Sequence, residues 1–182
     1  LLFSRRLPRQ LVLVYIALLP FALWLLIKGG GFLEVMPSTV FGGLMLTFFL
    51  GAIAMCLSLP VSILLALGRQ SKLPVIRWIC VGYIEFVRAV PLLTFLFMAS
   101  LMLQIFLPGG MEIDRLLRVL FVMIFVSAAY KAEILRGAIQ ALPGGQVEAS
   151  YAMGCGYWKT VIYIVMPQAL RNSVPALINK FI

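Results

Sequence analysis

An uncharged apolar run of 29 residues, Thr39–Leu67, constrains this chain more than any other feature. As a helix it would be about 44 Å long, whereas the hydrocarbon core of a bilayer is about 30 Å thick. We therefore expect this run to cross a membrane and to tilt, to kink near Pro60 or to protrude. The composition supports a membrane protein, because apolar residues without glycine make up 63% of the 182 residues and charged residues only 12%. Soluble domains have roughly 45–50% apolar residues even with glycine counted, and about 25% charged residues.

The remaining apolar stretches are separated by loops that contain glycine or charge, and we interpret them as further membrane helices. One precedes the long run and three follow it: Leu11–Ile27, Val90–Leu107, Leu116–Tyr130 and Thr160–Ile182. The third of these is expected to continue as a helix to about residue 142. The sequence thus predicts an all-α membrane protein with about five membrane helices. Residues 1–38 would form a first helix and an outer loop, and residues 39–182 the main membrane domain.

The basic residues predict the orientation of these helices. With the N-terminus in the cytoplasm, 11 of the 15 basic residues lie inside and three (Lys28, Arg115 and Arg118) lie in outer loops, while Arg88 lies within the membrane. Positive charge concentrates in cytoplasmic loops of membrane proteins, so this orientation obeys the rule and the reverse one violates it. The residues expected inside are Arg5, Arg6, Arg9, Arg69, Lys72, Arg77, Lys131, Arg136, Lys159, Arg171 and Lys180.

Missing residue types exclude several kinds of chemistry. The chain has no His, and its three cysteines (Cys56, Cys80 and Cys155) are widely separated, so we expect no catalytic site, no metal site and no redox pair. It has no GxxxxGK[ST] loop, so we expect no cofactor in this chain and do not expect an enzyme. The net charge of +9 is spread in small groups between apolar runs, which suits membrane lipid rather than nucleic acid.

Two charges inside an otherwise apolar segment are the first candidates for function. Glu85 and Arg88 are three residues apart on one helical face, so they can pair. A charge at membrane depth is costly, and such residues usually face a cavity or a partner. The pair belongs either to a gate or substrate path, or to an interfacial ion pair near the inner leaflet. Glu133 and Arg136 have the same spacing, and we expect them at a solvated helix end.

The second candidate is the less apolar segment Pro143–Trp158, which we expect on the cytoplasmic side. It reads as a short helix with Glu148 near its start, followed by a turn at Gly154 and Gly156. Its small apolar face comprises Ala149, Ala152 and Met153. Two interpretations stay open: the segment docks into a groove of another protein, or it lies on the membrane surface as an amphipathic helix.

Several motifs, in order, resemble those of the membrane subunits of bacterial ABC importers. Glu148-Ala149-Ser150, then Gly154, Ile164 and Met166-Pro167, are similar to the EAA loop of these subunits, with mild departures at Ser150 and Met166. Upstream, the stretch from Glu85 to Leu93 resembles the E-F-x-R-x-x-P-L-L motif of polar amino-acid permeases, and residues 136–146 resemble their run into the loop. Residues 62–69 and 97–100 look closest to permeases for general L-amino acids.

This resemblance implies an importer-type ABC transmembrane domain that works as a homodimer or heterodimer of permease subunits. The EAA loop would form the coupling helix that docks on a cytoplasmic ABC ATPase dimer, where ATP binds, and a periplasmic amino-acid-binding protein would deliver the substrate. By resemblance, Glu148, Ala149 and Gly154 are the ATPase-coupling residues. Members of the family carry a further membrane helix, so we expect the chain to be truncated at its C-terminal end.

The predicted function is therefore a multi-pass permease subunit of an ATP-driven, binding-protein-dependent amino-acid importer in the bacterial inner membrane. The alternative is a secondary transporter or channel driven by an ion gradient. Such proteins place ionisable residues near the middle of the membrane, and here only Glu85 and Arg88 could serve, both near one end of their span.

Overall fold

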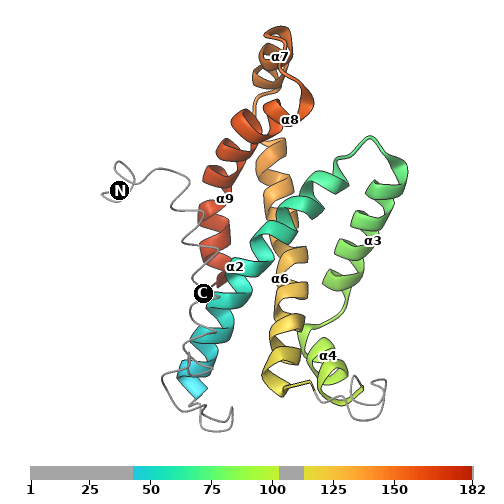
Figure 1. The fold of residues 1–182 in the computed structure, drawn as a ribbon, viewed down its shortest axis with the longest axis vertical. Coiled ribbons are helices and arrows are strands. Elements are labelled where there is room, and N and C mark those ends of the chain that lie inside the picture. The colour runs from blue at the N-terminus through green and yellow to red at the C-terminus, as the bar shows by residue number, and fades with distance from the viewer. Residues whose placement is uncertain (1–42, 103–112, 182) are drawn as a thin grey trace. The chain divides into compact units, whose positions relative to one another are not determined.

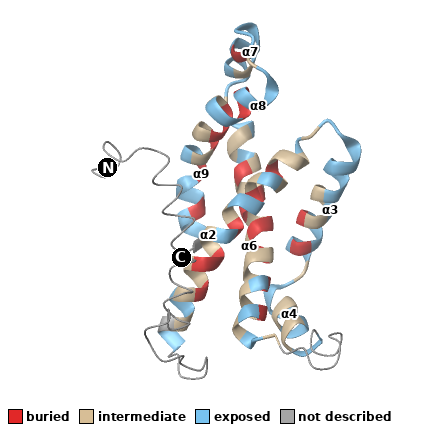
Figure 2. Cartoon of the chain, viewed as in Figure 1, coloured by how far each residue is buried: buried red, intermediate tan, exposed pale blue. Residues whose placement is uncertain are grey.

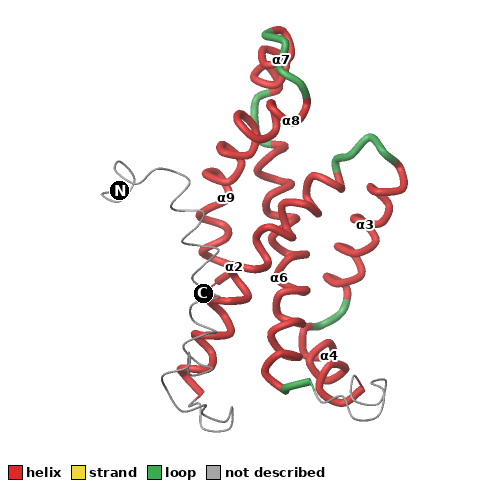
Figure 3. The backbone as a smooth tube through the Cα atoms, in the orientation of Figure 1, coloured by secondary structure: helices red, strands yellow, loops and turns green. Residues whose placement is uncertain are grey.

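The computed structural model describes residues 43–102 and 113–181, and every regular element in these two ranges is a helix (Figures 1 and 3). The all-α prediction is confirmed for this part of the chain. The predicted first helix, Leu11–Ile27, and its outer loop lie outside the described residues. The chain divides into two compact units, residues 1–58 with 92–125 and residues 59–91 with 126–182, and each is described by itself.

The long apolar run forms α2, Gly43–Arg69, which continues through Pro60 as a helix. Two buried serines next to this proline, Ser58 and Ser62, donate their hydroxyls to backbone carbonyls of the same helix at 2.5 and 2.6 Å. A helix that crosses an apolar medium must satisfy its polar groups internally. The two hydroxyls meet that requirement within α2.

A break at Val90 separates α3, Pro74–Ala89, from α4, Leu92–Phe97, which runs on into the π-helical turn η2, Met98–Met102. Val90 is extended, with φ −98° and ψ 132°, because the ring of Pro91 disfavours a helical backbone at the residue before it. The break falls at the start of the predicted spanning stretch, Val90–Leu107.

The helix α6, Arg115–Gln140, begins earlier than the sequence suggested. Arg115 and Arg118 lie in the first turn of α6 rather than in a loop, and their location on the outer side stays a prediction. Asp114 caps this helix, since its Oδ1 accepts the N–H of Leu116 at 2.9 Å. The predicted continuation of this helix to about residue 142 agrees with its observed end at Gln140.

The C-terminal part consists of two short helices followed by a long one. They are α7, Gly144–Ala152, and α8, Tyr157–Thr160; the π-helical turn η3, Val161–Val165, then leads into α9, Met166–Phe181. Figure 1 shows α7 and α8 at the same end of α6 and α9.

Two segments in the described ranges, Leu46–Arg69 and Tyr157–Lys180, have the length and apolar character needed to cross a membrane. α3 and α4–η2 together qualify as a third, broken span. The described part therefore supplies two or three of the roughly five predicted spans. The charges of α6 confine its uncharged stretch to residues 119–130, which is shorter than the roughly 20 residues of an ordinary transmembrane helix.

The core of the second unit joins α2, α3 and α6. Ala66, Ile84, Ala132 and Leu135 are at most 1% exposed and form one cluster, and Figure 2 marks buried positions on these three helices in red. The two alanines allow the helix backbones to approach closely, as small residues do between membrane helices. This packing fixes the helices that carry the charged residues described below.

Gly68, near the end of α2, lies against Cys80 of α3, and this contact generates a test. A Cβ atom at this glycine would overlap the Sγ atom of Cys80 on α3. Since overpacking a tight contact costs about 1–3 kcal/mol, we expect Gly68→Ala to lower the free energy of unfolding by that amount. The measurement is the apparent Tm of the purified permease in detergent.

The matched control is Gly82→Ala on α3, where nothing lies within 4 Å of the new methyl group; its Tm should stay near that of the parent protein. Adding Cys80→Ala to Gly68→Ala removes the overlapping sulfur and should restore the Tm. A double variant as unstable as Gly68→Ala alone would show that this contact is not the cause.

Candidate functional site

The predicted surface segment is a closed helix–turn–helix unit. α7 ends in a Schellman motif, in which the N–H of Gly154 donates to the Tyr151 carbonyl at 2.9 Å and the N–H of Cys155 to the Ser150 carbonyl at 3.1 Å. Gly154 has a φ of 76°, a left-handed conformation that L side chains rarely adopt. The turn after α7 therefore requires glycine at this position, as the sequence indicated.

A buried hydrogen bond fastens α7 to α8 across this turn. The hydroxyl oxygens of Ser150 and Thr160 are 2.7 Å apart, and the two residues are only 4% and 1% exposed. Thr160 also donates to the Gly156 carbonyl at 3.2 Å. At the start of α7, Gln168 of α9 donates to the side-chain oxygen of Gln146 at 2.6 Å. Sequence reasoning treated Ser150 as a mild departure from a motif and missed this contact, which only the fold brings together.

The outer side of the unit is exposed and largely apolar. Glu148, Ala149, Ala152 and Met153 are all exposed, with Met153 at 83%. Aromatic rings extend this surface, since Tyr157 and Trp158 are exposed and stack edge to face with centroids 5.3 Å apart. We call this set, together with Tyr151, the coupling surface. Within residues 43–102 and 113–181, Glu148 forms no ion pair.

A cluster of five charged side chains lies in the second unit and connects three helices. The carboxylate of Glu133 on α6 is 2.9 Å from Nη1 of Arg69 on α2 and 3.9 Å from Nη1 of Arg88 on α3. Arg136 also pairs with it and donates its Nε hydrogen to Oε1 at 2.7 Å. Arg69 reaches a second carboxylate, that of Glu85 on α3, at 3.1 Å.

These contacts refine the predicted pairings. The Glu133–Arg136 pair is present, with the spacing the sequence indicated. Glu85 and Arg88, in contrast, use partners on other helices, Arg69 and Glu133. A helical face shows which residues are neighbours along one helix but not what a second helix brings to them, so the sequence could not reveal the cross-helix pairs.

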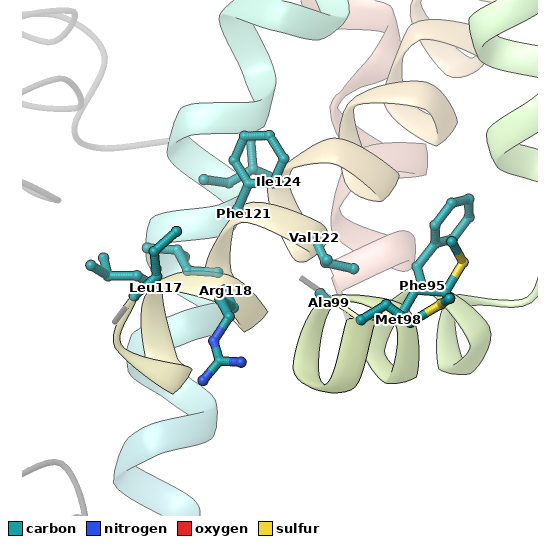
Figure 4. A pocket seen from close by; sticks show the side chains of 11 residues that line it. Phe95, Met98, Ala99, Leu117, Arg118, Phe121, Val122 and Ile124 are labelled. Carbon is teal, nitrogen blue, oxygen red and sulfur yellow. The ribbon is translucent and has the colours of Figure 1, made fainter. Parts of the chain in front are cut away.

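A separate apolar pocket of about 830 Å³ lies in the first unit, between α4–η2 and α6 (Figure 4). Phe95 and Met98 form part of one wall and Phe121 and Val122 part of the other. Among the described residues of its lining, Arg118 is the charged one; it is 6% exposed and donates from Nη1 to the Ser100 carbonyl at 2.9 Å.

The Nε atom of Arg118 has no hydrogen-bond partner among the described residues. Its burial was not evident from the sequence, where it stands next to a polar turn. The available signal was its place four residues before Val122, on a side of α6 that contains buried residues. No cluster of metal-ligating side chains occurs in the described part of the chain.

The described residues thus form apolar helices long enough to cross a membrane together with an exposed helix–turn–helix unit. The chain belongs to the family described as the inner membrane component of binding-protein-dependent transport systems, whose sequence pattern matches residues 58–182. The family predicted from the motifs is thereby confirmed.

Relatives within this family are similar over most of this chain. A glutamate/glutamine/aspartate/asparagine transport system permease protein of Rhodobacter capsulatus is 49% identical over 150 residues, which cover 82% of this chain and 35% of the relative. An inner membrane amino-acid ABC transporter permease protein of Escherichia coli K12 is 46% identical over 164 residues, covering 90% and 45%. The chain thus spans less than half of the length of these two relatives.

A solved structure supports the fold. The crystal structure of an amino acid ABC transporter with histidines matches with a TM-score of 0.65 and 33% identity, and the match covers 75% of this chain and 63% of that chain. Both of the relatives described above are named as transport permease proteins.

The charge cluster generates a prediction about stability. Replacing Glu133 by Gln removes the carboxylate that faces three guanidinium groups, and its side chain is only 19% exposed. Losing one partner of a fully buried pair costs about 3–5 kcal/mol, so for this partly solvated cluster we expect a loss of about 1–3 kcal/mol. The measurement is the apparent Tm of the purified permease.

Glu85→Gln serves as the matched control, because Glu85 has a single ion-pair partner within residues 43–102 and 113–181 and its side chain is 56% exposed. We expect less than about 1 kcal/mol from this variant, as for a solvated surface pair. Equal losses from the two variants would mean that Glu133 is not the centre of the cluster.

Proposed function

We propose that this chain is part of the permease subunit of an ATP-driven, binding-protein-dependent amino-acid importer. The observation that carries this proposal is the closed α7–turn–α8 unit, which presents an exposed apolar surface next to the carboxylate of Glu148, unpaired among the residues that the structure describes. A segment that only connected two helices would need neither the buried hydrogen bond between Ser150 and Thr160 nor the exposed rings of Tyr157 and Trp158.

The coupling surface is the proposed contact with a separate ATPase. Ala149 permits close approach of a partner groove, and Glu148 can pair with a basic group on that partner. Met153 and Trp158 supply apolar area, at 83% and 65% exposure. ATP would bind to the partner, and this chain would receive its movement through the coupling surface.

Two routes lead from the coupling surface to the membrane helices. One runs through α8, η3 and α9 as an unbroken helical segment, Tyr157–Lys180. The other runs back through α6, which the charge cluster fastens to α2 and α3 at Glu133. A push on α7 would therefore move several helices together, as alternating access requires.

Glu85 and Arg88 remain candidates for a gate or for the substrate path. Their contacts with Arg69 and Glu133 favour the gate, because charges engaged between helices hold the helices together rather than meet a substrate. Opening of the path would then separate at least one of these pairs.

The other proposals concern location and partners. The chain would lie in the bacterial inner membrane with its N-terminus in the cytoplasm, which places the coupling surface on the cytoplasmic side. Its partners would be a cytoplasmic ABC ATPase dimer, a second permease subunit and a periplasmic amino-acid-binding protein. Since the Rhodobacter capsulatus relative is named for glutamate, glutamine, aspartate and asparagine, these four amino acids are the first substrates to test.

We predict that proteoliposomes containing the full-length permease, its ATPase and its binding protein accumulate an amino acid only when ATP is supplied. Imposed proton or sodium gradients without ATP should give no uptake. Uptake driven by an ion gradient alone would support the alternative, a secondary transporter, and contradict the proposal.

A second prediction concerns the turn at Gly154. A Cβ atom at a φ of 76° costs about 1–2 kcal/mol, so Gly154→Ala should shift α7 relative to α8 and reduce ATP-driven uptake about tenfold. Gly137→Ala is the matched control, because this glycine lies inside α6 with nothing within 4 Å of the added methyl group. Normal uptake by Gly154→Ala, with normal ATPase binding, would show that the turn does not transmit force.

A further inference from the structure

A basic hollow lies in the second unit where α2 turns into α3. It has a volume of about 410 Å³ and is lined by Ser71, Lys72, Pro74, Arg77, Trp78 and Val81. Lys72 and Arg77 are exposed. The hollow therefore presents two cations and one aromatic ring within a small volume.

These two cations differ from Arg69, which lies a few residues earlier. Arg69 is engaged by the carboxylates of Glu85 and Glu133. Among the residues that the structure describes, neither Lys72 nor Arg77 forms an ion pair. Their charge is thus available to an anion from outside this part of the chain.

The start of α3 adds to this positive potential. Leu73 occupies the N-cap position and offers no side-chain hydrogen bond, and the first turn contains no acidic residue. The free N–H groups and the helix dipole make such an end favourable for an anion. Ser71 stands beside it and accepts the N–H of Leu73 at 3.2 Å, which leaves its hydroxyl hydrogen able to donate to a ligand.

The neighbouring face of α3 is suited to lipid chains. Val75, Trp78, Ile79 and Phe86 recur at helical spacing on one face and are exposed by 61–76%. The opposite face is buried, with Ile84 and Val87 fully covered. Figure 2 shows exposed positions along α3 in pale blue. Trp78 belongs both to this apolar stripe and to the hollow, so it stands at the boundary between an apolar and a basic surface.

We propose that this hollow binds the phosphate headgroup of an anionic phospholipid of the inner leaflet. Arg77 can hold two phosphate oxygens with its guanidinium, Lys72 supplies a second charge, and the acyl chains lie along the stripe of α3. The indole of Trp78 lies at headgroup level, where tryptophan concentrates in membrane proteins. The inference rests on the orientation given under the proposed function, which places the α2–α3 turn on the cytoplasmic side.

A lipid is favoured over a soluble anion or a protein by continuity with the membrane. The hollow begins two residues after Arg69, where the candidate span Leu46–Arg69 ends. The apolar stripe next to it needs an apolar partner, and a soluble phosphate has none to offer. Basic pockets beside membrane helices on the cytoplasmic side are suited to such headgroups.

Native mass spectrometry of the full-length permease, titrated with phosphatidylglycerol or phosphatidylcholine, tests the proposal. We expect the parent protein to retain phosphatidylglycerol in preference to phosphatidylcholine. Lys72→Gln and Arg77→Gln should each weaken retention of phosphatidylglycerol about fivefold, in line with the contribution of one basic residue near an anionic surface. Arg171→Gln removes one exposed positive charge elsewhere in the same unit and should leave retention unchanged.

Contact with the lipid itself is measured through Trp78 in a full-length variant in which every other tryptophan, Trp24 and Trp158 among them, is replaced by Phe. Brominated phosphatidylglycerol should quench its fluorescence more than brominated phosphatidylcholine, and Lys72→Gln/Arg77→Gln should remove the difference. Equal quenching by the two lipids, or unchanged retention in the double variant, would overturn the proposal. Displacement of the lipid by millimolar inorganic phosphate, or its release when the ATPase binds, would do so as well.

Uptake measurements, combined with the lipid-preference measurements above, separate this inference from the proposed function. Proteoliposomes made from phosphatidylcholine alone report ATP-driven uptake without an anionic headgroup. Uptake there, together with no preference for phosphatidylglycerol, would refute only the lipid site. A preference for phosphatidylglycerol in a protein that takes up nothing with ATP would refute only the transport proposal.

Discussion

The arrangement of the second unit depends on the ion pairs made by the carboxylate of Glu133. Arg69 of α2, Arg88 of α3 and Arg136 of α6 all point to it. Three guanidinium groups at such distances repel one another strongly unless a negative charge lies between them. Apolar packing of Ala66, Ile84, Ala132 and Leu135 brings the same helices together. The charge cluster adds specific contacts between the turns of α2, α3 and α6 that contain Arg69, Arg88 and Glu133.

The ion pairs of Glu133 matter for the helix–turn–helix unit at the end of α6, because they join α6 to α2 and α3. A helical hairpin transmits force only when it is stiff and when the helices that hold it move together. The Schellman turn at Gly154 and the buried Ser150–Thr160 hydrogen bond make α7 and α8 one body. The bond from Gln168 to Gln146 attaches this body to α9. The exposed apolar side chains of the α7–turn–α8 unit form the surface on which the proposed coupling depends.

The short helix α7, the glycine turn that follows it and the Glu133–Arg136 pair were predicted from the sequence. Gly154 was identified as a turn because glycine favours a sharp bend, whereas Glu148 and Ala149 were assigned to coupling by their place in a motif, which stays a prediction. The break before Pro91 followed from a local steric rule. The role of Ser150, the partners of Glu85 and Arg88, and the burial of Arg118 were not accessible in this way. The first two depend on contacts with residues elsewhere in the chain. The burial of Arg118 depends on where α6 begins, which the cap at Asp114 sets.

The sequence by itself determined that this chain is helical, that it belongs in a membrane and which family it joins. Apolar runs, glycines and short motifs are local signals, and their physical causes act within one helix or one turn. Only the tertiary structure decided that Arg69 meets two carboxylates while Lys72 and Arg77 meet none in the described residues. These three residues look alike in sequence. Their charges are distinguished by what the fold brings within a few ångströms of each, because electrostatic attraction depends on distance in space.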